Sequence, residues 1–135
     1  MGIKSLLAHK NLLVLVLAYT TLIGWLSLAK VHIPIDSSIQ GSDKVGHLLA
    51  YFVFTIVWFL FFFFSEKQNR SFAQSLMWAG ILAFLFGILM EFFQAILTSY
   101  RSSEWYDVLA NTSGIIFAAI VLKMLQNKLV RFKRA

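Results

Sequence analysis

Five polar side chains stand close together in a chain that is otherwise strongly apolar. They are Glu91, Gln94, Arg101, Asp107 and Asn111. A carboxylate can donate or accept a proton at a reacting group. An arginine guanidinium binds a carboxylate or a phosphate through two parallel hydrogen bonds. These residue types predict a site for an anionic ligand, with Arg101 as its receptor and Glu91 as a candidate acid–base residue.

A second polar group comes earlier in the chain and has the spacing of one helix face. Asp43, His47 and Tyr51 recur every four residues, and Lys44 adjoins them. The His47 imidazole can exchange a proton near neutral pH, so it is the second candidate acid–base residue beside Glu91. We expect Asp43, Lys44 and Tyr51 to contact the ligand, together with Gln94, Arg101, Asp107 and Asn111 of the first group.

Metal and cofactor chemistry has no clear signature in this sequence. His47, Glu91 and Asp107 are residue types that bind divalent cations, but their positions match no diagnostic metal-site spacing. No zinc-protease motif, nucleophile elbow, Walker loop or Rossmann glycine pattern occurs, and there is no cysteine. We therefore expect no bound metal and no other cofactor.

The elements that position these residues are predicted to be membrane-spanning helices. The chain is 59% hydrophobic and 13% charged, with a mean hydropathy of +0.76. Four apolar runs, at residues 11–29, 45–64, 73–98 and 107–125, are each close to the roughly 18 to 20 residues that span a bilayer. The runs are continuous rather than alternating, which excludes a β-barrel. We predict an all-α integral membrane four-helix bundle that forms one domain over residues 1–135.

On the third and fourth runs, small residues share a helix face with the polar residues. Small side chains let membrane helices approach closely, so these faces should turn inward. The phenylalanines at residues 59 and 61–64 are expected to face lipid. The inward faces comprise Ala83, Gly87, Glu91 and Gln94 on the third run, and Asp107, Asn111, Gly114 and Ala118 on the fourth.

The distribution of positive charge predicts the orientation in the membrane. Nine of the 12 Lys and Arg residues fall on the side of the two chain ends if all four helices cross. The positive-inside rule then places both termini in the cytoplasm and the polar groups near the outer surface. The basic tail after the fourth run is expected to contact anionic membrane lipids, not nucleic acid. An alternative for the first run is a signal peptide cleaved after Ala29, which would leave this orientation unchanged.

The polar residues also carry a family resemblance. D-K-x-x-H-x-x-x-Y from Asp43, E-x-x-Q from Glu91 and R-x5-D-x-x-x-N-x-x-G from Arg101 occur in the order and spacing of the VanZ-like family. This sequence has Ala118 where a glycine is expected, and it lacks the Pro-Gly often found before Arg101. The resemblance implies a small polytopic protein of the bacterial cytoplasmic membrane. It also implies a cell-envelope role, of the kind linked to resistance against the glycopeptide teicoplanin.

Three functions remain open at this stage. The leading interpretation is an outward-facing polar pocket that binds or modifies an anionic molecule linked to lipid or to the cell wall, such as a cell-wall precursor. Whether the pocket also catalyses a reaction is left open. The alternatives are a small transporter or channel, for which a homo-oligomer would serve, and a structural or accessory subunit whose polar residues only hold helices together.

The predicted orientation can be tested by cysteine labelling in intact cells. Because the chain has no native cysteine, single cysteines can be introduced at Ser38, Ser71 and Ser103. We expect an impermeant thiol reagent to label the cysteines at positions 38 and 103, which lie on the predicted outer side. The cysteine at position 71 should be labelled only after the cells are opened. Labelling of position 71 alone in intact cells would reverse the orientation.

Overall fold

The structure, a computed structural model, describes residues 6–29, 42–99 and 105–135. Within these ranges the chain forms five α-helices and no β-strand. The first four are long and apolar enough to cross a membrane, which confirms the predicted all-α membrane bundle of four spans. The helices are α2 (His9–Leu28), α3 (Ser42–Phe64), α4 (Phe72–Leu97), α5 (Trp105–Met124) and the short α6 (Gln126–Arg134).

Local sequence signals set the helix boundaries between α3 and α4. The turn contains Asn69 with a positive φ of 40°, a conformation that asparagine tolerates better than most residues. Ser71 then caps α4 by accepting a hydrogen bond from the Gln74 backbone N–H. The Gln74 side chain reciprocates by accepting from the Ser71 N–H. This capping box satisfies two backbone donors that the first helical turn would leave without partners.

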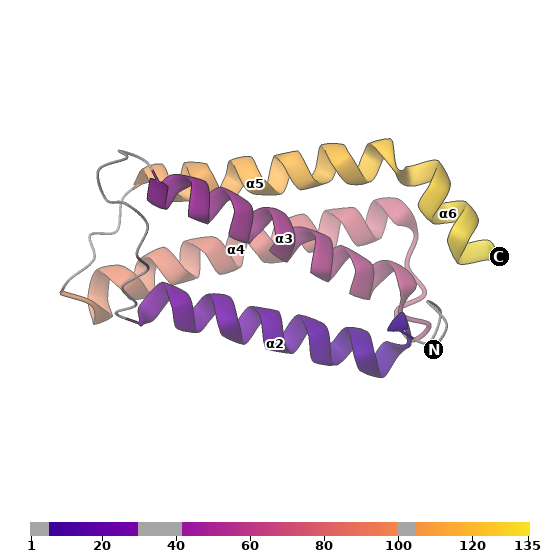
Figure 1. Cartoon of the computed structure of the whole chain (residues 1–135), viewed down its shortest axis with the longest axis horizontal. Helices are drawn as coiled ribbons and strands as arrows, with labels where there is room; N and C mark the ends of the chain where they lie inside the picture. Colours follow the sequence, from indigo (N-terminus) through magenta and orange to yellow (C-terminus); the bar gives the residue numbers. More distant parts are fainter. Residues whose placement is uncertain (1–5, 30–41, 100–104) are drawn as a thin grey trace.

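The four long helices run side by side, with α3 packed against α2, α4 and α5 (Figure 1). The beginnings of α3 and α5 lie at the same end of the bundle as the last turns of α2 and α4 (Figure 1). We call this end the site end. The other end, where α5 gives way to α6 and the chain reaches its C-terminus, we call the tail end.

The backbones of α3 and α5 approach closely at Gly114. A Cβ atom added at Gly114 would overlap the backbone carbonyl oxygen of Leu48 and lie 3.0 Å from the Phe52 nitrogen. Backbone atoms cannot move aside without displacing a whole helix. The absence of a side chain at Gly114 therefore allows α3 and α5 to pack at this distance.

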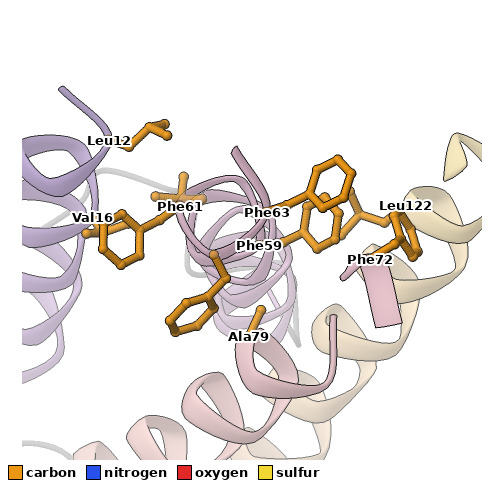
Figure 2. Close-up of a cluster of buried hydrophobic side chains, with 10 residues drawn as sticks. Leu12, Val16, Phe59, Phe61, Phe63, Phe72, Ala79 and Leu122 are labelled. Carbon is orange, nitrogen blue, oxygen red and sulfur yellow. The ribbon is translucent and has the colours of Figure 1, made fainter. Parts of the chain in front are cut away.

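The tail end is filled by aromatic and aliphatic side chains from all four long helices (Figure 2). Phe59 is fully buried and packs edge-on against Phe72 of α4, and Phe63 contacts Phe72 as well. Phe61 lies on the side of α3 that faces Val16 of α2 (Figure 2). The prediction that the phenylalanines of this stretch face lipid is wrong for Phe59 and Phe61–Phe63, which are buried. The reason is that neighbouring helices cover α3 on several sides at this depth.

Large apolar side chains on the other helices remain exposed on the outside of the bundle. Val14 of α2, Leu85 of α4 and Ile116 of α5 are among them. A water-soluble protein rarely exposes contiguous apolar patches of this kind. Their exposure fits a bundle whose outer surface contacts lipid tails.

The basic helix α6 folds back onto the turn between α3 and α4. The Lys133 ammonium donates a hydrogen bond of 3.1 Å to the carbonyl oxygen of Arg70 and lies over the Phe63 ring. Partial burial in this position lowers the pKa of Lys133. The Arg70 guanidinium in turn lies over the Trp78 ring. The tail is thus fixed to the bundle by hydrogen bonding and by cation–π contacts.

Gly114→Ala should destabilise the bundle, because the added methyl group would collide with the backbone of α3. We expect a loss of about 1–3 kcal/mol in the free energy of unfolding, the range for an overpacked interior. Gly80→Ala is the matched control, since its Cβ would meet only the Ile115 side chain at 3.9 Å. Unfolding of both variants in detergent can be followed by circular dichroism. Equal stability of the two variants would contradict the close approach of α3 and α5.

Candidate functional site

Polar side chains from three helices meet in the interior of the site end. α3 supplies Lys44 and His47 from its first two turns, α4 supplies Glu91 from near its end, and α5 supplies Asp107 and Asn111. Glu91, Asp107 and Asn111 are 3–5% exposed. Ionisable groups buried inside a membrane protein are costly, so their clustering marks a functional site more often than ordinary packing.

Asn111 links the histidine to the buried glutamate. The His47 Nδ1 atom lies 3.0 Å from Asn111 Oδ1, and Asn111 Nδ2 donates to Glu91 Oε1 over 3.5 Å. Because an amide oxygen only accepts, the hydrogen of the imidazole is placed on Nδ1, which leaves Nε2 as the basic nitrogen. His47 Nδ1 is also 3.9 Å from Glu91 Oε1, close enough for an ion pair when the ring is protonated.

An ion pair stands nearer the helix ends. The Lys44 ammonium lies 2.5 Å from Asp107 Oδ1 and 2.8 Å from Asp43 Oδ2. The Asp107 side chain is only 8% exposed, whereas those of Lys44 and Asp43 are 28% and 55% exposed. Lys44 therefore bridges one buried carboxylate and one that is open to the surroundings.

Tyr51 lies deeper in the bundle, beside the same network. Its side chain is buried, and its hydroxyl has no hydrogen-bond partner among the residues that the structure describes. A Cβ atom at Gly87 would lie 3.1 Å from the Tyr51 ring and 3.4 Å from Asn111 Nδ2. Gly87 thus leaves the space in which the tyrosine ring and the asparagine amide sit together.

Three of these residues have the geometry of potential metal ligands. His47, Glu91 and Asp107 each offer one ligand atom, and the three atoms lie within 4.8 Å of one another. The sequence spacing alone did not reveal this, because the three residues come from three different helices.

Not every predicted site residue joins this cluster. The Gln94 side chain is buried, but its amide donates to the Ser27 carbonyl oxygen and so ties α4 to α2. Asp43 lies at the exposed edge and is connected to the cluster through Lys44. Arg101 lies outside the described residues. From α2, the Tyr19 hydroxyl donates to the Ala50 carbonyl oxygen beside the cluster-bearing face of α3.

Four membrane-length helices around a buried ionisable cluster define a multi-pass membrane protein. The VanZ/LLP1 family matches residues 7–126, and the chain belongs to this family. No curated protein and no solved structure matches the chain.

The Lys44–Asp107 pair should contribute asymmetrically to stability. Lys44→Met leaves the buried Asp107 carboxylate without this ammonium, and we expect a cost of about 1–3 kcal/mol. Asp107→Leu should cost less, because Lys44 keeps Asp43 as a partner. The double variant should regain part of the stability that Lys44→Met loses. Reversible unfolding in detergent measures the free energy of unfolding of all three variants. If the effect of the double variant equals the sum of the two single effects, the pair does not interact.

Proposed function

We propose that the protein binds the anionic headgroup of an envelope lipid or of a lipid-linked cell-wall precursor in a polar pocket at the site end. The pocket opens to the outer face of the bacterial cytoplasmic membrane. The observation that carries the proposal is the convergence of half-buried His47 with buried Glu91, Asp107 and Asn111 at one end of an otherwise apolar bundle. Membership of the VanZ/LLP1 family supports an envelope role and a link to glycopeptide resistance.

The depth of the cluster suits a lipid headgroup. Glu91 precedes Thr98, the C-cap residue that follows α4, by seven positions, which corresponds to about 10 Å along a helix. Lys44 stands between the buried carboxylates and the exposed edge, where an ammonium can receive a phosphate or a carboxylate. Arg101 belongs to the connection between α4 and α5, and its guanidinium is the proposed second anion receptor.

The apolar packing at the tail end is evidence against a transport path through a single copy of the chain. Phe59, Phe63 and Phe72 fill the bundle there, and no described residue of the two tail-end turns of α3 is charged (Figure 2). A path for protons or ions needs polar groups across the full depth of the membrane. The polar cluster is confined to the site end, so binding from that end is favoured.

If the bound molecule is also chemically changed, His47 and Glu91 are the pair placed to move a proton. His47 Nε2 is the free basic nitrogen of the proposed tautomer, and Asn111 orients the ring through Nδ1. Catalysis and plain binding differ in what is recovered with the protein, because only catalysis produces an altered form of the ligand.

Glu91→Gln should abolish ligand retention with little loss of stability. The substitution keeps the size of the side chain but removes the charge that faces His47 and Asn111. The protein would be purified from bacterial membranes in mild detergent, and co-purified lipids would be identified by mass spectrometry. We expect the wild type to retain an anionic lipid-linked species that Glu91→Gln and Lys44→Met both lose.

Glu66→Gln is the matched control, because Glu66 is an exposed glutamate in the turn after α3, at the tail end. It should retain the ligand as the wild type does. Retention by Glu91→Gln equal to that of the wild type would show that the cluster only holds the helices together.

A further inference from the structure

We propose that His47, Glu91 and Asp107 form a binding site for one divalent transition-metal cation of the Zn²⁺ or Mn²⁺ class. This site goes beyond the proposed lipid pocket, because a cation can bind here whether or not a lipid is present. The three ligand atoms lie within 4.8 Å of one another and come from α3, α4 and α5. Such a cation would hold these three helices together at the site end.

The ligand types and their separation suit such a cation. One imidazole nitrogen with two carboxylate oxygens is a donor set used for zinc, and carboxylates also suit manganese. Ligand atoms about 2.1 Å from a tetrahedral ion are about 3.4 Å from each other. The observed limit of 4.8 Å therefore requires each ligand to move inward by less than about 1 Å, which small side-chain rotations provide.

The electrostatics of the cluster favour a doubly charged ion. Glu91 and Asp107 place two carboxyl groups inside an apolar bundle at 4% and 5% exposure. Lys44 is shared between Asp107 and the exposed Asp43. An ion between Glu91 and Asp107 would contact both buried carboxylates directly, which repays part of the cost of burying them.

The buried hydroxyl of Tyr51 is a second, independent observation that points to a bound ligand. A buried tyrosine hydroxyl usually has a hydrogen-bond partner, and Tyr51 has none among the described residues. Its ring and Asn111 Nδ2 both lie beside Gly87, and Asn111 in turn donates to Glu91. Three protein ligands leave a coordination position open for water, and a cation-bound water in this region can donate a hydrogen bond to the tyrosine oxygen.

Lys44 is the competitor that the cation must displace. Its ammonium contacts Asp107 Oδ1, so its positive charge now lies beside one of the three proposed ligands. Asp43 offers Lys44 a second carboxylate at 2.8 Å. Cation binding would therefore move Lys44 towards Asp43 and the exposed edge without depriving the ammonium of a partner.

The test is direct cation binding to the full chain purified through a histidine-free affinity tag and treated with chelator. Zn²⁺ would be titrated by calorimetry, and Mn²⁺ by the loss of its free electron paramagnetic resonance signal. We expect one ion per chain and a rise in unfolding temperature with cation concentration. Glu91→Gln and Asp107→Asn should weaken the affinity by about tenfold or more. Lys44→Met should strengthen it, because the competing ammonium is removed.

Glu66→Gln is the matched control, since it removes an exposed carboxylate outside the trio. It should leave cation affinity unchanged within about twofold. Absence of saturable cation binding by the wild type would overturn the metal site. So would cation affinities of Glu91→Gln and Asp107→Asn that equal the affinity of the wild type. Lys44→Met separates the two proposals, because it should lose the anionic lipid but gain cation affinity.

Discussion

The contact between Gly114 of α5 and the Leu48 carbonyl of α3 determines how the site is built. His47 immediately precedes Leu48, and Asn111 lies one turn before Gly114. When the two backbones touch at Gly114, the imidazole and the amide are carried to hydrogen-bonding distance. Glu91 of α4 then accepts a hydrogen bond from the Asn111 amide, which connects α4 to the other two helices. A larger residue at position 114 would separate every one of these pairs.

The bundle divides its interior between two kinds of packing. At the tail end, stacked and edge-on phenylalanine rings fill most of the space between helices. At the site end, small residues such as Gly87 make room for Tyr51 and the polar network. The aromatic end supplies rigidity that does not depend on charge. A polar network can therefore persist at the other end without being the main source of stability.

Much of the fold could be predicted from the sequence, because membrane helices carry strong local signals. The four apolar runs predicted the four long helices to within about three residues at their ends, a usual uncertainty for helix boundaries. Helical spacing also placed Glu91, Asp107 and Asn111 on buried faces. Spacing could not show that α3 lies among the other helices, and so the phenylalanines at its tail end were assigned to lipid. Which helix occupies the centre depends on contacts between distant segments.

The partners within the site could not be predicted for a related reason. Sequence spacing fixes the direction of a side chain around its own helix, but the distance between two helices depends on single contacts such as that at Gly114. Gln94 shares the buried face of α4 with Glu91, yet it bonds to α2 because it lies about one turn nearer the helix end. Lys44 contacts both Asp107 and Asp43 because it lies where the buried and exposed parts of the cluster meet. The identity of the polar residues was readable from the chain, whereas their pairing follows from the way three helices converge.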